Sequence, residues 1–447
     1  MTDVNRIAAA MGVKCIISGE MQEKMLFWDR LYTNKANWQK GRTKPLRIPS
    51  AVSKELKRLT LKEFSANVND VFTDEAFQKF IPVLRRKLDY GLALGGMLFK
   101  PYWNGSPHID IVFQNEYVPV NFSDDFCESV ICPENLTIGK TSYTRLEMHT
   151  YDVRNQTHTI ENRCFRSSNP AILGSECSLS EVPEWSDILP KKTFYGVSQP
   201  LFSVFRVPDM NTIDTDSPLG ISVFADAADT IKNADDQWER ILWELESSER
   251  AIDAAIDFFK LKDGKPVLPV GRERMFHTYE TNPNTDKPIF STFSPEIRDS
   301  SYFNAFNQML RRIENSCGLA YGCLSEIGDV EKTAEEIKSS KQRSYDRVHE
   351  IQETLRPTLE TAVYGMKYLS DYYSGKPNTD VKLTCTFGDG ILEDADKEFN
   401  RRMQMVTSGL LSKEKFLMWY FSCDESKARE FMPVETDLFG GNNAVPV

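Results

Sequence analysis

A run of acidic residues near the carboxyl end is the first group whose types and spacing could hold a metal ion. Asp389 is followed by Glu393, Asp394 and Asp396, and carboxylate oxygens are ligands that Ca²⁺ and Mg²⁺ prefer. The same spacing also suits a turn that leads into a helix, because the helix dipole favours acids in the first turn. We interpret the run as such a helix start and predict no metal site there.

The histidines and cysteines offer no better candidate for catalysis. The nine cysteines are scattered and form no Cys-x-x-Cys pair, which favours free thiols in a reducing cytoplasm over disulfides or a zinc site. The sequence contains no P-loop, dinucleotide-binding glycine motif, zinc-protease helix motif or serine-hydrolase elbow. We therefore expect no catalytic residue, no cofactor and no enzyme activity, unless folding assembles a site around a histidine. The five histidines are far apart in the sequence: His108, His149, His158, His277 and His349.

The charge balance limits what the chain can bind. The 447 residues carry a net charge of −11, whereas a protein that grips DNA by neutralising phosphates is normally basic. Tight binding of DNA over the whole surface is therefore excluded. No segment approaches the roughly 20 uninterrupted apolar residues that a membrane-spanning helix needs. The apolar stretch at residues 7–17 is interrupted by Lys14 and lacks the basic start of a signal peptide.

The amino-terminal half predicts helices followed by strands. Helical spacing covers residues 21–32 and 51–64, the second with Ser50 as its cap, and a third helix begins near Thr73. The period changes at Leu94, and Asn104-Gly105 lies between two apolar runs as a hairpin turn would. Strand-like alternation continues to about residue 205, so we expect a β-rich domain.

Two long helices are predicted in the second half. Ser217 and Pro218 form a strong helix start, and the helix is expected to reach residue 249. At roughly 48 Å this helix is longer than a small domain needs, so we expect part of it to pack on another subunit. A second serine–proline start begins a helix over residues 294–317, and a turn-rich insertion with a few strands separates the two. An apolar residue recurs at every seventh position of the first helix: Phe224, Ile231, Trp238 and Leu245.

A glycine-rich loop and a longer helix follow. The loop, residues 318–332, contains three glycines, so we expect a mobile segment between rigid helices. A capping box at Thr333 then opens a helix to about Tyr373, in which Pro357 predicts a kink near residues 353–356. Short helices are expected from Asp394 to residue 431, and a loose tail from residue 433. Their predicted caps are Ser412 and Ser422.

Four segments are specific in their combined order and spacing: Tyr90-Gly91-Leu92-Ala93-Leu94-Gly95-Gly96, Asp214-Thr215-Asp216-Ser217-Pro218-Leu219-Gly220, Cys317-Gly318-Leu319-Ala320 and Lys332-Thr333-Ala334-Glu335-Glu336-Ile337. Together they resemble the portal proteins of long-tailed phages and prophages of Gram-positive bacteria, sometimes called minor capsid proteins. The resemblance covers residues 22–432.

The resemblance implies a mixed α+β portal fold. A wing with a helical amino-terminal part and a β-rich domain would cover residues 1–216. The stem would consist of helices 217–249 and 294–317, with a small α/β clip at 250–293 between them. A tunnel loop would cover 318–332, a second wing segment with the long kinked helix 333–390, a helical crown 391–432 and a flexible tail 433–447.

The resemblance also implies a function and partners. Portal subunits form a ring, usually of twelve, at one capsid vertex of the virion, and they assemble in the host cytoplasm. Double-stranded DNA is packaged and ejected through the ring. The partners would be terminase, head–tail connector proteins, the major capsid protein and scaffolding proteins, with no membrane. Acidic channel walls would repel the duplex and keep it centred.

The resemblance places particular residues in that ring. The predicted stem packing would use the four apolar residues of the first long helix. The tunnel-loop residues expected to face DNA are Tyr321, Leu324, Ser325, Glu326, Asp329, Glu331 and Lys332.

Two other functions remain open from the residues alone. One is a capsid-associated enzyme, such as a nuclease or protease, whose site the motifs do not reveal. The other is a helical adaptor or scaffold protein without a channel. The mass of the purified protein distinguishes them, because a portal predicts a ring, an enzyme a monomer, and an adaptor a dimer or trimer.

Overall fold

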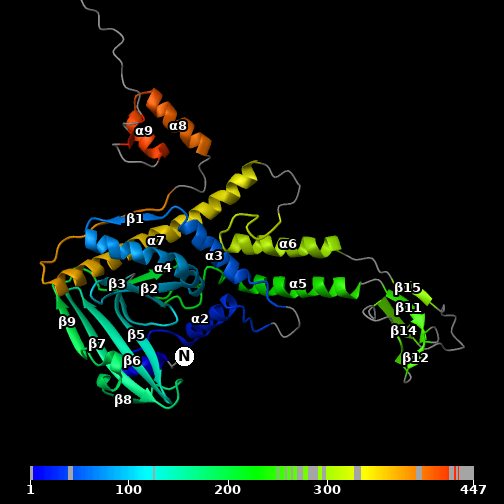
Figure 1. The fold of residues 1–447 in the computed structure, drawn as a ribbon, viewed down its shortest axis with the longest axis horizontal. Helices are drawn as coiled ribbons and strands as arrows, with labels where there is room; N and C mark the ends of the chain where they lie inside the picture. The colour runs from blue at the N-terminus through cyan, green and yellow to red at the C-terminus, as the bar shows by residue number, and fades with distance from the viewer. Residues whose placement is uncertain are drawn as a thin grey trace, which may run out of the picture. The chain divides into compact units, whose positions relative to one another are not determined.

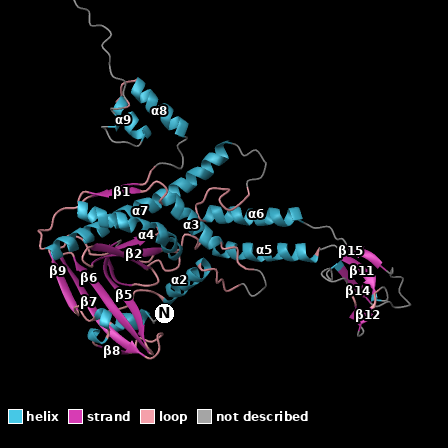
Figure 2. Cartoon of the chain, viewed as in Figure 1, coloured by secondary structure: helices cyan, strands magenta, loops and turns pink. Residues whose placement is uncertain are grey.

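The computed structural model describes residues 4–38, 44–123, 126–248, 251–256, 259–262, 265–268, 275–279, 290–293, 299–326, 334–388, 395–421, 427–428 and 431 (Figure 1). The chain divides into two compact units, residues 1–388 and 389–447, and each is described by itself. Helices and strands both contribute extensively to the first unit, so the predicted mixed α+β class is confirmed (Figure 2).

Four helices open the first unit: α1 (Val4–Ala10), α2 (Gly19–Tyr32), α3 (Ile48–Thr60) and α4 (Val71–Leu94). Ser18 caps α2, and Asp70 caps α4 by accepting a hydrogen bond from the Thr73 backbone nitrogen. The prediction that Ser50 caps the helix expected over residues 51–64 is wrong, because that helix, α3, already begins at Ile48 with a proline in its first turn. Proline suits that turn, where its missing N–H would have no partner in the helix.

The predicted hairpin joins two strands of a three-stranded antiparallel sheet. Strand β2 (Gly96–Trp103) pairs with β3 (Pro107–Phe113) on one side and with β10 (Ser203–Arg206) on the other. Gly105 adopts φ +73° in the connecting turn, which confirms the expectation from Asn104-Gly105. Helices α4 and α7 (Ala334–Ser374) both pack on this sheet.

A larger antiparallel sheet makes up most of the β-rich region. Its strands follow the order β4 (Val118–Ser123), β5 (Phe126–Ile138), β6 (Thr141–Asp152), β7 (Thr157–Ser167) and β8 (Ser175–Cys177), and β9 (Lys191–Tyr195) also pairs with β7. Two short 3₁₀ turns, η1 (Leu179–Glu181) and η2 (Pro183–Trp185), lie between β8 and β9. A separate pair joins β1 (Ser65–Val68) to β16 (Leu383–Thr386).

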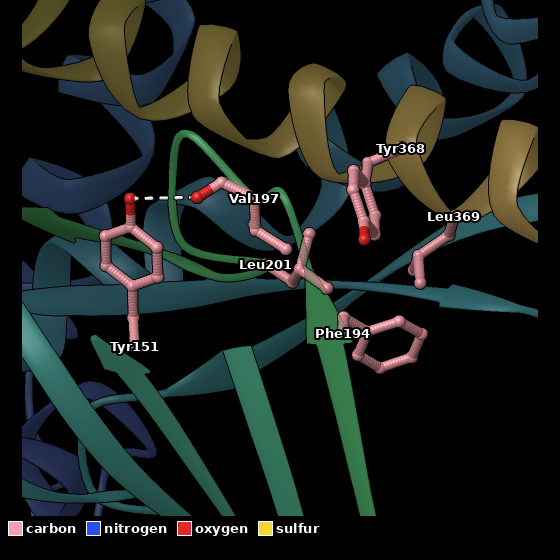
Figure 3. Close-up of a cluster of buried hydrophobic side chains, with 6 residues drawn as sticks. All are labelled: Tyr151, Phe194, Val197, Leu201, Tyr368 and Leu369. Carbon is pink, nitrogen blue, oxygen red and sulfur yellow. Dashed lines mark hydrogen bonds between the residues drawn. The ribbon is translucent and has the colours of Figure 1, made fainter. Parts of the chain in front are cut away.

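A buried cluster fastens the larger sheet to α7. Tyr151, Phe194, Val197 and Leu201 face Tyr368 and Leu369 of the helix (Figure 3). The Tyr151 hydroxyl also donates a 3.2 Å hydrogen bond to the Val197 carbonyl oxygen. The carboxyl-terminal half of α7 therefore belongs to the core of this unit, and α7 is helical through Pro357.

A buried glutamine joins three distant segments. Gln114 follows β3 and is fully buried. Its side-chain nitrogen donates to the carbonyl oxygens of Leu94 (2.8 Å) and Gly220 (2.9 Å), and its side-chain oxygen accepts from the Gly220 backbone nitrogen at 3.1 Å. The side chain thereby ties the end of α4 to the segment after residue 213.

Two glycines make this junction possible. Gly95 ends α4 with φ +93°, and a Cβ there would lie 2.4 Å from the Gly220 carbonyl oxygen. A Cβ on Gly220 would lie 2.1 Å from the Gly95 carbonyl oxygen. Neither position therefore has room for a side chain.

The junction explains why one predicted helix starts late. Helix α5 (Ala228–Ser247) begins only at Ala228, so the predicted start at Ser217 and Pro218 is wrong. The Ser217 hydroxyl instead accepts a hydrogen bond from the Leu219 backbone nitrogen in a local turn. The segment is held in a non-helical path because its apolar side chains fill the core: Leu219, Ile221, Val223 and Phe224 are buried.

Helix α6 (Asp299–Ser316) lies beside α5, and a strand-rich insertion connects them (Figure 1). The insertion contains β11 (Ala251–Ala255), β12 (Leu261–Lys262), β13 (Lys265–Pro266), β14 (Phe276–Tyr279) and β15 (Phe290–Phe293), with β11 between β14 and β15. This confirms the predicted strands. The start predicted at Ser294 lies outside the described residues.

The second unit contains α8 (Ala395–Thr407) and α9 (Lys413–Phe421). The Ser412 hydroxyl accepts a 3.3 Å hydrogen bond from the Lys415 backbone nitrogen, which confirms its predicted role as a cap. Asp396 lies in the first turn of α8, as expected, whereas the predicted cap Ser422 and the acidic residues 389–394 lie outside the described residues.

The Gln114 junction gives a prediction about stability. Replacing Gln114 with Leu leaves three buried backbone groups of Leu94 and Gly220 without partners, so the free energy of unfolding should fall by about 2–4 kcal/mol. Denaturant unfolding followed by circular dichroism measures the change. Gln199→Leu, at an exposed position, is the matched control and should leave the stability unchanged. Equal stability of the two variants would contradict the role assigned to Gln114.

Candidate functional site

Helix α6 ends in a sharply defined turn. Gly318 adopts φ +71°, and the backbone nitrogens of Gly318 and Leu319 donate to the carbonyl oxygens of Asn315 and Glu314. This pair of bonds is a Schellman motif, in which glycine supplies the left-handed residue. A Cβ on Gly318 would also lie 2.8 Å from Arg347 of α7. The backbone conformation at Gly318, where the predicted loop begins, is therefore well defined.

A buried carboxylate holds the first part of this loop. Glu314 of α6 is fully buried. Its carboxylate accepts hydrogen bonds from the backbone nitrogens of Gly322 (3.1 Å), Leu324 (2.6 Å) and Ser325 (2.9 Å), and from the Ser325 hydroxyl at 2.7 Å. Bonds to an ionised acceptor are among the strong ones in proteins. The loop backbone is thus wrapped around one side chain.

A second side chain of α6 extends this anchor. Asn307 accepts a hydrogen bond from the Glu326 backbone nitrogen at 2.8 Å and donates to the Glu326 carbonyl oxygen at 3.1 Å. The Arg311 guanidinium also donates to that carbonyl oxygen, at 3.4 Å. The expected mobile loop therefore begins with a stretch whose backbone is hydrogen-bonded to α6 at several points, namely at Leu319, Gly322 and residues 324–326.

The predicted loop residues fall into three groups. Ser325 is buried against Glu314 and serves as an anchor. The Arg343 guanidinium lies 5.7 Å above the ring of Tyr321, Leu324 is partly buried and Glu326 is exposed. Asp329, Glu331 and Lys332 lie outside the described residues.

The two long helices pack mainly on each other. The rings of Trp238 on α5 and Phe306 on α6 are 5.6 Å apart. Ile231 is buried within the same unit, and Phe224 is buried ahead of α5 rather than on it. Of the predicted stripe, only Leu245 is largely exposed, at 42%.

The carboxyl-terminal half of α5, residues 238–247, carries exposed apolar residues that the sequence pattern did not reveal. We call it the outer half of α5 and the preceding residues the inner half. Trp243 is 65% exposed, and Leu242, next to it, is 37% exposed. Leu245 is exposed as well, but residues two apart on a helix point in different directions, so the name α5 apolar surface, used below, means these three exposed positions and not a single helix face. Phe303 of α6 is also exposed. The heptad pattern concealed Trp243, because it lies outside the seven-residue spacing.

The inner half of α5 is tied to the amino-terminal region. Asp235 accepts hydrogen bonds from the Trp38 indole nitrogen (3.0 Å) and the Leu46 backbone nitrogen (2.9 Å). Burial raises the pKa of the Asp235 carboxyl. This acid is therefore a structural hydrogen-bond acceptor rather than part of a solvated face.

Arg347 of α7 lies next to Gly318, directly after the end of α6, and forms an ion pair there. Its guanidinium bonds both carboxylate oxygens of Asp209, one of them at 2.7 Å. A cleft of about 570 Å³ lies beside this pair, between α6, α7 and residues 221–226. Four carboxylates and two guanidinium groups line it, so its charge disfavours an anionic ligand such as a nucleotide.

Folding does bring two histidines together, which the sequence analysis did not predict. His149 and His158, on paired strands β6 and β7, have ring nitrogens 3.0 Å apart, and the other His149 nitrogen is 2.8 Å from the Glu147 carboxylate. The only signal was the alternation along β6, which places residues 147 and 149 on one face of the strand.

This histidine cluster is a buried ion network. Glu147 also bonds Lys100 of β2 at 2.8 Å and Arg145 at 2.6 Å, which links the two sheets. Burial alone would raise the pKa of the Glu147 carboxyl, but Lys100, His149 and Arg145 hold it well below its usual range. Burial also lowers the pKa of His158 well below its usual value. Both histidines are buried, so no substrate reaches them.

The described residues contain no group of three or more histidine, cysteine or acidic side chains that could hold a metal ion. Among the helices in the described ranges, none combines the length and apolar character needed to cross a membrane.

Comparison with known proteins identifies the family. The family model described as phage portal protein, SPP1 Gp6-like, matches residues 133–431, about two thirds of the chain. Three of the four segments that carry the resemblance lie inside this range, and the first, at residues 90–96, precedes it. No curated protein matches the chain. The chain therefore belongs to the SPP1 Gp6-like phage portal proteins, structural virion components that form the portal channel at the capsid vertex.

Proposed function

We propose that this portal subunit assembles into a closed ring of about twelve copies around a DNA channel. The observation that carries the proposal is the family match, which includes α5, α6, the insertion between them and the loop after α6. The partners we propose are terminase, head–tail connector proteins, the major capsid protein and scaffolding proteins. Double-stranded DNA passes through the ring during packaging and ejection.

The helices and sheets suggest the parts of this ring. Helices α5 and α6 would form the stem, and the small sheet between them the clip. The wing would combine the four amino-terminal helices, the two larger sheets and α7. The second unit, with α8 and α9, would form the crown, and residues 433–447 the tail.

The ring number has a direct test. Native mass spectrometry of the purified full chain should give a mass near twelve times 51.2 kDa, and negative-stain images should show closed rings. A stable monomer would contradict the proposed assembly, and a dimer or trimer would favour a helical adaptor.

We propose that the α5 apolar surface packs against the neighbouring subunit. Three apolar side chains are exposed within one chain: Leu242, Trp243 and Leu245. Burying them in a subunit contact would lower the free energy, because apolar surface would leave water. Trp238 and Ile231, in contrast, are already used inside the subunit. Of the predicted stem stripe, only Leu245 would therefore take part in the subunit contact, together with Leu242 and Trp243, which lie outside the stripe.

Substituting Trp243 tests this assignment. Trp243→Glu places a charge in the proposed contact, so the affinity between subunits should fall on the order of tenfold or more. Size-exclusion chromatography with light scattering should show fewer rings, while circular dichroism shows unchanged melting of the isolated subunit. Asn233→Glu adds the same charge at another exposed position of α5 and should leave rings intact. Normal ring formation by Trp243→Glu would assign the neighbour contact elsewhere.

We propose that the anchored loop lines the DNA passage. Glu326 is exposed directly after the anchor and would repel the duplex, and Tyr321 and Leu324 would lie beside it. Asp329 and Glu331 would add repulsion, and Lys332 a transient phosphate contact. Ser325 is left out of this DNA-facing set because its hydroxyl is bonded to Glu314.

The Glu314 anchor gives a prediction about the loop. In Glu314→Gln, the amide oxygen can still accept from the three loop amides, but it lacks the negative charge of the carboxylate, and an NH₂ faces the Ser325 hydroxyl, so every bond of the anchor is weakened. Hydrogen–deuterium exchange of the Gly322, Leu324 and Ser325 amides should become about tenfold faster. Rings should still form, but phage heads should package or retain less DNA.

Glu326→Gln is the matched control, because it removes the same charge from an exposed side chain on the same loop. It should leave the exchange of these amides unchanged. Unchanged exchange in Glu314→Gln would show that the carboxylate does not hold the loop. Faster exchange with normal DNA retention would show instead that the loop is only a connector.

A further inference from the structure

Two cysteines lie directly opposite each other at the edge of the larger sheet. Cys164 of β7 and Cys177 of β8 are partners in the antiparallel register. Their sulfur atoms are 3.4 Å apart, and both are free thiols. Chance placement of two thiols in one register pair is uncommon, because cysteine is a rare residue.

The register pairing of the two strands brings the two thiols close to bonding distance. A disulfide needs an S–S distance of about 2.05 Å, so the sulfurs must approach by roughly 1.4 Å. The strands are joined by residues 168–174, and the last residue of this connection is conformationally constrained. Gly174 adopts φ +79° just before β8, where a Cβ would lie 2.0 Å from the Arg166 carbonyl oxygen. Because the two residues are already paired across the strands, the change that remains is the approach of the two sulfur atoms.

The two thiols differ in access. Cys164 is buried among Leu179, Val182 and Trp185, whereas Cys177 is only partly buried. Strand β8 has three residues and pairs with β7 alone, so it can separate locally at low cost. A small reagent therefore reaches Cys177 first.

We propose that Cys164 and Cys177 form an intrachain disulfide when the protein meets a low-molecular-weight disulfide oxidant. The Cys177 thiolate attacks one sulfur of the oxidant, and a mixed disulfide forms as the first small thiolate leaves. The Cys164 thiolate then attacks the Cys177 sulfur and displaces the second small thiolate. The two protons released from the cysteines end on those two products, so two cysteine thiols and one oxidant give one protein disulfide and two small thiols.

The protein moves from a reducing to an oxidising environment, which would allow the disulfide to form. A portal subunit folds in a reducing cytoplasm, but it is a virion component and leaves the cell with the particle. The bond would close a loop of the chain at the sheet edge and hold β8 on β7 outside the cell. The thiol geometry itself does not depend on ring formation or on the DNA channel.

Burial of the two thiols slows the proposed oxidation. It raises the pKa of the Cys164 thiol to about 12 and also raises that of Cys177. The reactive thiolates are therefore scarce at neutral pH, and oxidation should be slow there and faster at higher pH. Slow oxidation suits a bond that forms in released particles rather than during assembly.

The test uses the purified full chain and oxidised glutathione. After oxidation at pH 8.5, free thiols are alkylated under denaturing conditions and the chain is digested with trypsin. Mass spectrometry should find the peptide 164–166 linked to the peptide 167–191, with the loss of two hydrogens. The melting temperature should rise by a few degrees, and dithiothreitol should reverse both changes.

Two variants make the outcome decisive. Cys177→Ser should lose the linked peptide and the rise in melting temperature, whereas Cys15→Ser, at another partly buried cysteine, should keep both. Glutathione on Cys177 without closure to Cys164 would overturn the proposal, as would a link that forms only between two chains. Ring formation by the reduced protein is measured separately, so failure of the disulfide leaves the portal assignment intact.

Discussion

The buried side chain of Gln114 is the constraint on which the course of the chain depends. It satisfies backbone groups of Leu94 and Gly220 that have no water to bond, and an unpaired buried group of this kind costs about 1–3 kcal/mol. The close approach of Gly95 and Gly220 then fixes where the chain leaves the sheets. Because residues 219–224 fill the core first, helix α5 can start only at Ala228.

Buried polar side chains also determine the backbone course at α5 and α6. Asp235 fixes the inner half of α5 through Trp38 and Leu46, and Glu314 fixes the loop that follows α6. Each carboxylate is removed from water and is compensated by hydrogen bonds, as a buried charge or polar group must be. The acidic composition of the chain therefore has two origins. Some acids are internal acceptors that shape the backbone, and others, such as Glu326, are exposed charges.

Local patterns were enough to predict much of the fold. Helical spacing predicted α2 and α3, start signals predicted helices at α4, α6 and α7, the Asn104-Gly105 turn located the hairpin, and Ser412 was correctly predicted as a cap. The start at Ser217 failed because capping preferences amount to about 1 kcal/mol, and tertiary packing overrides them. Contacts between distant residues, such as Ser325 with Glu314 or His149 with His158, leave no periodic signal. The portal function came from the resemblance, since no motif with its own chemistry carries it.

A ring explains why the outer half of α5 can keep exposed apolar side chains in a subunit that is otherwise acidic. In a closed ring each subunit contributes two different surfaces, and every contact is repeated around the axis. One modest apolar contact per interface is then multiplied by the number of subunits, and closure means that no surface is left uncovered. In a monomer, Trp243 would instead keep 65% of its surface in water. The net charge of −11 per chain opposes association at long range. Short-range apolar contacts must therefore supply the attraction, and the exposed residues of α5 are of the type that can do so.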